Sequence, residues 1–421
     1  MFPTLPAERH RFERGCAGGE RMSADCEQGK AWTSGFSLRL PDPRCCWHWL
    51  SGLNNRSREC IGRDCVGYSI MTPDLPIRGR LTLITDKQHS DWRETALTVE
   101  AAAGEVVIGQ QPLIRLINIA LFARGHVLLE GDVGVGKTTI LRAFARAVGG
   151  EFERVEGSID LLPNDLVYHT YVDADGQPHI EPGPLLRHGD RLTTFFFNEI
   201  NRARPQVQSL LLRAMAEYTL SAFNLEFTFP HMTVFADRNK IEKEETFELA
   251  SAARDRFMFE LNMTTPADDD IRRKLLLDTA YHNVDKLLER IDSGICHGDE
   301  LNDIGAAIQQ FVRTSPALDN YLLDLWRASE TPQRYGVSLE SAEIDRLILA
   351  GASPRGMSAL TRAARVAAWL EGRDHVLPED AQAVFPTCMI HRVFFTPIFE
   401  LRRTEIAPAL IDGILHQVAA P

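Results

Sequence analysis

The stretch LLEGDVGVGKTT, residues 128–139, decides the fold of this 421-residue chain. Within it, GDVGVGKT (131–138) matches the pattern GxxxxGK(S/T). The apolar run HVLLEG (126–131) before it predicts a short buried strand, and KTTILRAFARAVGG (137–150) after it predicts a helix that ends at glycines. A strand, a glycine-rich loop and a helix in this order form the context in which the pattern wraps around a phosphate group.

The residue types of this loop suit a nucleotide with its magnesium ion. Glycines let successive N–H groups and the helix N-terminus point at a phosphate, Lys137 brings a positive charge to the outer phosphates, and Thr138 offers a hydroxyl to Mg²⁺. The alternative is a glycine-rich turn with an exposed lysine. The residues predicted to contact the nucleotide are Gly131, Asp132, Val133, Gly134, Val135, Gly136, Lys137, Thr138 and Thr139.

The rest of the chain predicts an α/β fold. Further apolar strands are expected at 193–197, 232–236 and 256–263, and helices at 110–125 and 204–220. Strands that alternate with helices indicate a parallel sheet covered on both faces, an αβα P-loop core. Beyond Thr264 the patterns at 268–291, 341–351 and 354–372 are helical, so a separate all-helical lid domain is expected. The predicted domains are an extension at 1–75, a nucleotide-binding core at 76–265 and a helical lid with C-terminal helices at 266–421.

A second candidate site follows the strand TTFFF, in the stretch TTFFFNEINRAR (193–204). Glu199 can orient and activate an attacking water, whereas the neutral Asn198 would hold the hydration shell of the metal with a carbonyl rather than a charge. Asn239 follows the next strand, at the edge of a parallel sheet where ligands bind, and could position the γ-phosphate or the water. The alternatives are an ordinary surface carboxylate for Glu199 and a turn residue for Asn239.

Composition narrows the classes of function. Apolar residues make up 44% and charged residues 25%, which is typical of a globular protein. The net charge of −12 argues against a nucleic-acid or anionic-membrane partner, which usually requires a basic patch. The sequence contains no run of about 18 apolar residues, the length that a membrane-spanning helix needs. The N-terminus also lacks the apolar stretch of a secretory signal, so a cytoplasmic location is expected.

Six of the eight cysteines lie in the first 65 residues. Cys60 and Cys65 have a CxxxxC spacing, wider than the usual CxxC pairs of a zinc site. Residues 1–75 show no periodicity, so we expect a disordered Cys-rich extension or a translation of sequence upstream of the true start.

Taken together, several motifs resemble the MoxR family of AAA+ ATPases. They occur in family order between about residues 99 and 392: LLEGDVGVGKTT, GSIDLLPNDL (157–166), EPGPLL (181–186), NEINRARPQVQSLLLRAMAEYTL (198–220), ARDRFMFEL (253–261) and GASPRGMSALTRAARVAAWLEGRDHVLPEDA (351–381).

The resemblance implies a role for each candidate residue. Lys137 and Thr138 would bind phosphate and Mg²⁺, Glu199 would be the catalytic glutamate and Asn239 the first sensor. Arg256 would be an arginine finger offered to the nucleotide of a neighbouring subunit, and Arg355 a second sensor from the lid. The residue-level alternatives are a strand-end salt bridge for Arg256, with Arg254 as a rival finger, and a solvated side chain for Arg355.

The family further implies a ring, expected to be hexameric. It also implies a partner with a von Willebrand factor A domain and a client enzyme, a metalloenzyme or dehydrogenase, that the ATPase activates like a chaperone. Asn198 stands where the usual pattern has Asp, and ADRNK (236–240) replaces the common ATQNP, so slow turnover is expected. Two other functions stay open: an ATP-binding switch with little hydrolysis, and a nucleic-acid motor, which the acidic composition disfavours.

Overall fold

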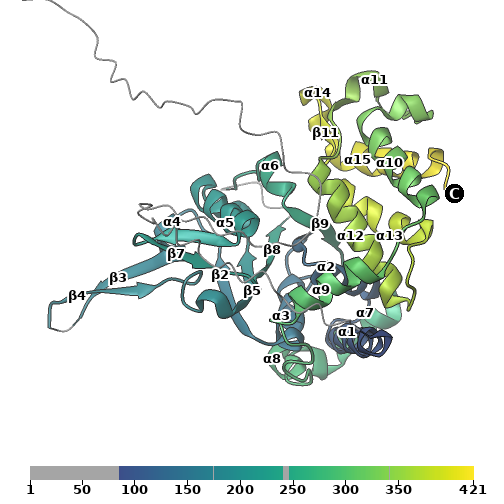
Figure 1. Ribbon diagram of the computed structural model, residues 1–421. Coiled ribbons are helices and arrows are strands. Elements are labelled where there is room, and N and C mark those ends of the chain that lie inside the picture. Colours follow the sequence, from purple (N-terminus) through teal and green to yellow (C-terminus); the bar gives the residue numbers. More distant parts are fainter. Residues whose placement is uncertain (1–84, 174, 240–245, 341) are drawn as a thin grey trace, which may run out of the picture. The chain divides into compact units, whose positions relative to one another are not determined.

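The computed structural model describes residues 85–173, 175–239, 246–340 and 342–421 (Figure 1). All of them belong to one unit of the chain, Arg80–Pro421. The predicted extension at 1–75, with its six cysteines, lies outside the described residues.

The first part of this unit alternates helices and strands. Its elements are α1 Asp86–Val106, α2 Gln111–Phe122, β1 His126–Gly131, α3 Lys137–Val148, β2 Glu151–Glu156, α4 Pro163–Val167, β3 Tyr168–Val172, β4 Pro178–Pro182, β5 Leu192–Asn198, α5 Pro205–Glu217, β6 Thr219–Ala222, β7 Leu225–Thr228, β8 Thr233–Asn239, α6 Ser251–Arg254 and β9 Phe257–Met263.

Five of these strands form one sheet in the order β2-β5-β8-β1-β9, and every neighbouring pair is parallel (Figure 1). The apolar runs of β1, β5 and β8 explain their central places, because a strand buried on both faces carries few polar side chains. Parallel pairing brings the carboxyl ends of all five strands to one edge of the sheet, where ligands of open α/β folds bind.

Alternate residues of the strands face opposite sides of the sheet. Phe196 and Phe235 pack into the hydrophobic core that also contains residues of α1, α2 and α3. Phe197 and Ala236, one position further along, pack into a second core with α4 and α5. The predicted αβα arrangement is therefore confirmed, and α3 covers the first of these two faces.

The second part of the unit is helical, as predicted. Its elements are α7 Asp269–Leu277, α8 Val284–Leu288, α9 Leu301–Phe311, α10 Pro316–Glu330, α11 Ile344–Leu347, β10 Ile348–Ala350, α12 Pro354–Leu370, α13 Pro378–Met389, β11 Phe394–Phe395, α14 Pro397–Glu400 and α15 Arg403–Gln417. The start of α12 is fixed by Ser353, whose Oγ accepts a hydrogen bond of 3.1 Å from the N–H of Gly356, with Pro354 in the first turn.

Several elements were not predicted. The helical pattern at 341–351 is only one turn of helix, α11, because residues 348–350 pair with β11 in a short antiparallel sheet. The helix α1, the strand β2 and the two hairpins β3–β4 and β6–β7 were also missed. Within the described ranges, no helix is both long and apolar enough to cross a membrane. The domain boundary at residue 265 stays a prediction.

Candidate functional site

The glycine-rich loop connects β1 to α3. Gly134 and Gly136 have φ angles of 80° and 100°, in the region that glycine adopts without strain. At Gly131 a Cβ atom would lie 2.4 Å from the carbonyl oxygen of Met263 on β9, so only glycine fits there. These glycines leave Asp132, Val133 and Gly134 exposed at the edge of the sheet.

Lys137 is the first residue of α3 and is buried, with 6% of its surface exposed. Its Nζ donates hydrogen bonds of 2.9 Å to the carbonyl oxygens of Gly131 and Asp132 and one of 2.7 Å to Oδ1 of Asn239. The ammonium group is thus held at the centre of the loop, and the alternative of an exposed lysine on a glycine-rich turn is wrong.

Asn239 links this lysine to Glu199. Its Nδ2 donates a hydrogen bond of 2.9 Å to Oε1 of Glu199, while Oε2 of Glu199 lies 3.1 Å from Nε of Arg202. Glu199 has a φ of 53°, which is unusual for a residue other than glycine. Gly157 packs against this backbone, where a Cβ atom would lie 2.2 Å from the carbonyl oxygen of Glu199.

Asp237, on β8, is the residue that sequence reasoning missed. Its side chain is 2% exposed, and its Oδ1 accepts a hydrogen bond of 2.6 Å from the backbone N–H of Glu199. Burial raises the pKa of Asp237 to about 6, against the lowering effects of that hydrogen bond and of the positive charge of Lys137. The signal in the sequence is ADRNK (236–240), in which Asp237 stands where the common ATQNP has Thr.

Asn198 ends β5 and is 7% exposed. Its Nδ2 donates a hydrogen bond of 3.2 Å to Oε1 of Glu156, at the end of β2. Asn198 precedes Glu199 in the chain, yet its side chain makes no hydrogen bond to the phosphate loop in the described residues.

The residues present fit a nucleotide and its metal ion. In the described part of the chain, the first N–H of α3 with a backbone partner is that of Ile140, which donates to Gly136 at 3.1 Å. The N–H groups from Gly134 to Thr139 are therefore available to a phosphate. The hydroxyl of Thr138 and the carbonyl Oδ1 of Asn198 are oxygen ligands of the kind that Mg²⁺ prefers.

The two arginines predicted as finger and sensor lie apart from this chain of contacts. In the described residues, the side chain of Arg256 makes no hydrogen bond or ion pair, and its Nε is buried without a partner. Its rival Arg254 lies 3.5 Å from Oε2 of Glu260. Arg355 is exposed at the start of α12, with its Nη1 3.3 Å from Oδ2 of Asp255.

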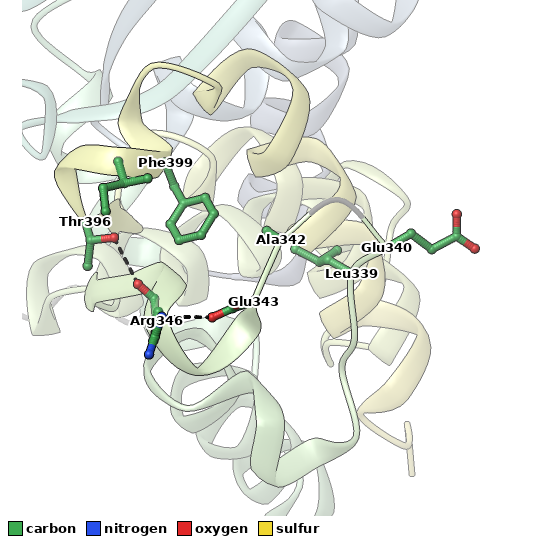
Figure 2. A pocket seen from close by; sticks show the side chains of 8 residues that line it. Leu339, Glu340, Ala342, Glu343, Arg346, Thr396 and Phe399 are labelled. Carbon is green, nitrogen blue, oxygen red and sulfur yellow. Dashed lines mark hydrogen bonds and ion pairs between the residues drawn. The ribbon is translucent and has the colours of Figure 1, made fainter.

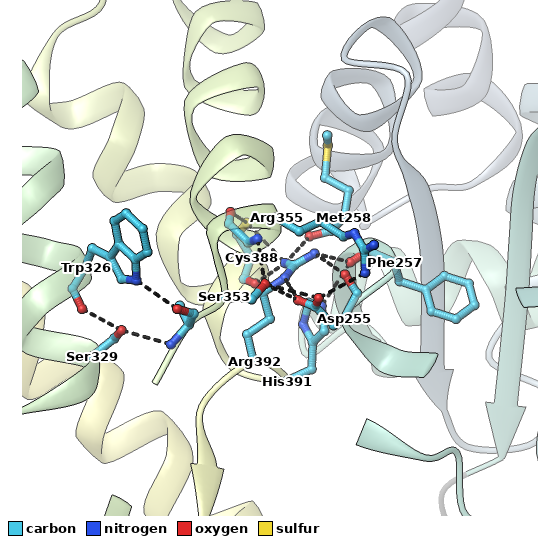
Figure 3. A network of polar contacts seen from close by, with 12 residues as sticks. Asp255, Phe257, Met258, Trp326, Ser329, Ser353, Arg355, Cys388, His391 and Arg392 are labelled. Carbon is cyan, nitrogen blue, oxygen red and sulfur yellow. Dashed lines mark hydrogen bonds and ion pairs between the residues drawn. The ribbon is translucent and has the colours of Figure 1, made fainter. Parts of the chain in front are cut away.

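Asp255 joins the helical part to the start of β9 (Figure 3). Its carboxylate accepts hydrogen bonds from Ser353 at 2.9 Å and 3.1 Å and from Nε of Arg392 at 3.0 Å. Arg392 is 1% exposed and also donates to the carbonyl oxygens of Phe257 at 2.5 Å, Met258 at 2.9 Å and Cys388. Arg355 is therefore tied to the residue that immediately precedes Arg256.

A cavity of about 800 Å³ lies between α11 and α14, outside this site (Figure 2). Two polar contacts in its lining are made within the protein: Arg346 lies 3.3 Å from Glu343, and Thr396 donates to the carbonyl oxygen of Arg346 at 2.9 Å. None of the predicted site residues lines this cavity.

Two family models match the chain. Residues 126–259 match the ATPase family associated with various cellular activities (AAA), and residues 341–410 match the AAA lid domain. Protein MoxR of Methylorubrum extorquens is 53% identical over 80% of this chain and 98% of its own length. Protein MoxR of Paracoccus denitrificans is 51% identical over 80% and 99%, and Chaperone MoxR1 of Mycobacterium tuberculosis is 33% identical over 77% and 82%.

Among solved structures, a candidate ATPase from Cytophaga hutchinsonii is similar, with a TM-score of 0.68 and 28% identity over 80% of this chain and 98% of the other. The fold, the phosphate loop and the lid define a P-loop ATPase of the AAA+ class. Within that class, the chain belongs to the MoxR family, as its resemblance to that family predicted.

Proposed function

We propose that this chain binds ATP with Mg²⁺ and hydrolyses it slowly, and that the cycle remodels or activates a client protein. The observation that carries the proposal is the continuous contact from Lys137 through Asn239 to Glu199, at distances of 2.7 Å and 2.9 Å. A phosphate-binding cation, an amide and a carboxylate are thereby positioned together at the carboxyl edge of the sheet.

Each residue of this chain of contacts has a role in the proposal. The N–H groups at 134–139 and Lys137 hold the phosphates, and Mg²⁺ would neutralise phosphate charge between Thr138 and the end of β5. Glu199 accepts a proton from the attacking water. Asn239 couples the presence of the outer phosphate to the position of the Glu199 carboxylate through their hydrogen bond. The backbone of Glu199 is already fixed by Asp237, which reduces the cost of orienting the carboxylate.

The proposal includes a ring, expected to be hexameric, in which Arg256 acts on the nucleotide of the neighbouring subunit. Its support is that Arg256 has no side-chain partner within the described residues, whereas Arg254 lies against Glu260. Light scattering with and without ATP measures the mass of the assembly and so the number of subunits in the ring. Mixing Arg256→Ala with Glu199→Gln, each defective alone, should then restore turnover, because the intact Arg256 of one subunit can serve the intact Glu199 of its neighbour. No recovery in mixed rings would exclude a finger shared between subunits.

Arg355 is the proposed second sensor. It is exposed, and its ion pair with Asp255 at 3.3 Å is weak because solvent screens the guanidinium. A bound phosphate can therefore compete for its guanidinium at little cost. We expect Arg355→Ala to weaken ATP binding and to leave the thermal stability of the nucleotide-free protein within about 0.5 kcal/mol.

The central test is steady-state phosphate release by the wild-type protein, Lys137→Ala, Glu199→Gln and a matched surface control, Glu217→Gln. We expect Lys137→Ala to lose ATP binding, and Glu199→Gln to keep binding but lose hydrolysis by a factor of about 100 or more. The control should behave as wild type, because Glu217 is exposed and, among the described residues, pairs only with Arg213 at 3.0 Å. A wild-type rate of phosphate release equal to that of Glu199→Gln would contradict the proposed hydrolysis of ATP.

A second candidate is an ATP-binding switch with little hydrolysis, which the neutral Asn198 favours. Equal rates for wild type and Glu199→Gln, together with ATP-dependent oligomerisation, would support this switch. A chaperone-like role is suggested by the name of the relative Chaperone MoxR1. The client enzyme and the von Willebrand factor A partner remain predictions from the family, and the cytoplasmic location remains a prediction from the sequence.

A further inference from the structure

Three side chains form a row at the carboxyl ends of β2, β5 and β8. Glu156 of β2 pairs in register with Asn198 of β5. The last register pair of β5 and β8 joins Phe197 to Ala236, so Asn198 and Asp237 follow at the next position on each strand. The three strands are neighbours in the sheet (Figure 1), and the row therefore reads carboxylate, amide, carboxylate.

This row lies on the face of the sheet that α3 covers. Phe196 and Phe235 belong to the core shared with α3, and Asn198 and Asp237 each come two residues later. Their side chains hence point to the same face as α3, whose first turn carries Lys137 and Thr138. Asp237 lies two residues before Asn239, which contacts Lys137 at 2.7 Å, so the row adjoins the phosphate loop where P-loop proteins hold magnesium.

The charges in the row explain why Asn198 is neutral. Neighbouring strands are about 4.8 Å apart, so an aspartate at 198 would lie beside carboxylates on both sides. At such a distance, a negative charge on one carboxylate disfavours the charged form of its neighbour. Asn198 instead donates its amide to Glu156 at 3.2 Å and separates the two acids.

P-loop ATPases hold Mg²⁺ with a loop Ser or Thr and an acidic residue at the end of a neighbouring strand. Here the strand that precedes Glu199 ends in an amide, and the acid stands one strand away. We propose that Asp237 supplies the acidic group of the magnesium site that Asn198 does not provide, a role that rests on the proposed ATP binding.

The contacts of Asp237 allow this second role. Its Oδ1 accepts the N–H of Glu199 at 2.6 Å, while its Oδ2 accepts no hydrogen bond within the described part of the chain. One oxygen positions the catalytic glutamate, and the other stays free for the hydration shell of the ion. Asp237 thus couples the metal to the backbone of Glu199.

The test measures Mg²⁺ dependence of binding for a non-hydrolysable ATP analogue, the β,γ-imido triphosphate, by isothermal titration at constant ionic strength. The variants are Asp237→Asn, Asn198→Asp and the double variant with both substitutions, called the exchange. Asp345→Asn, at an exposed position on α11, is the control. An asparagine at 237 keeps an oxygen for the N–H of Glu199, so the first variant removes only charge. Circular dichroism checks that each variant is folded.

We expect Asp237→Asn to need about tenfold more Mg²⁺ than wild type to reach half of the Mg²⁺-dependent gain in affinity for the analogue, a loss of about 1.4 kcal/mol. The exchange should return the Mg²⁺ requirement to within about threefold of wild type, because it restores a single acid. Asn198→Asp alone should not lower the requirement, and the control should match wild type.

An unchanged Mg²⁺ requirement in Asp237→Asn would overturn the proposal and leave Asp237 as a structural residue. An exchange variant no better than Asp237→Asn would also overturn it. Failure of the proposed function gives a different result: wild type and Lys137→Ala would then bind the analogue equally weakly, with or without Mg²⁺.

Discussion

Arg392 is predicted to contribute more to the stability of the protein than its charge alone suggests. In Arg392→Met, Asp255 loses the contact at 3.0 Å, and the carbonyl oxygens of Phe257 and Met258 lose donors at 2.5 Å and 2.9 Å. Removing one partner of a buried pair costs about 3–5 kcal/mol, since the other charge stays buried. Asp255 keeps its contacts with Ser353 and Arg355, so we expect the lower end, about 3 kcal/mol.

Urea unfolding followed by circular dichroism measures this loss, and thermal unfolding should show Tm lower by about 4 °C. The matched control is Arg213→Met, which removes an exposed arginine 3.0 Å from Glu217 within α5. That pair is worth about 0.5 kcal/mol at most. The reasoning is refuted if Arg392→Met unfolds within 1 kcal/mol of wild type, or if the control loses as much.

Three further predictions follow from the site and the core. The pKa of Asp237 is raised from 3.8 to about 6, so its favourable contribution to the free energy of unfolding is present below pH 4 and is lost as the pH rises through 6. Urea titrations at pH 4 and pH 7.5 should show Asp237→Asn more stable than wild type at pH 7.5 by up to about 3 kcal/mol. Equal stability of the two proteins at both of these pH values would contradict this. Gly157→Ala should lower ATPase activity at least tenfold, because its Cβ would lie 2.2 Å from the carbonyl oxygen of Glu199; wild-type turnover would show that the backbone moves freely. Burial raises the pKa of Cys296 to about 12 and also raises that of Cys388, so mass spectrometry after iodoacetamide treatment at pH 8 should find both unmodified until urea is added, and labelling in the folded protein would refute their burial.

The parts of the fold that sequence predicted are those fixed by local patterns. The strand β1, the loop from Gly131 and the helix α3 follow from consecutive residues, because apolar periodicity and glycine positions are local properties. The pattern at 341–351 failed for the opposite reason: residues 348–350 pair with Phe394 and Phe395, which no local signal reveals.

The candidate site shows the same division. Lys137 and Glu199 were identified from motifs, and their contact through Asn239 follows from parallel strands that end at one edge. The sequence alone does not single out Asp237, because its role depends on the register between β5 and β8. That register is set by packing across the sheet rather than by the residues around Asp237.

The carboxylate of Asp255 has a consequence for timing. It accepts hydrogen bonds from three residues of the helical part, Ser353, Arg355 and Arg392. Asp255 is also the residue directly before Arg256 in the chain. In the proposed cycle, a rotation of the helical part would therefore act directly on Arg256. If Arg256 acts on the nucleotide of the neighbouring subunit as proposed, release of a subunit's own nucleotide and withdrawal of its Arg256 from the neighbouring site would be a single event. Hydrolysis would then proceed sequentially around the proposed ring.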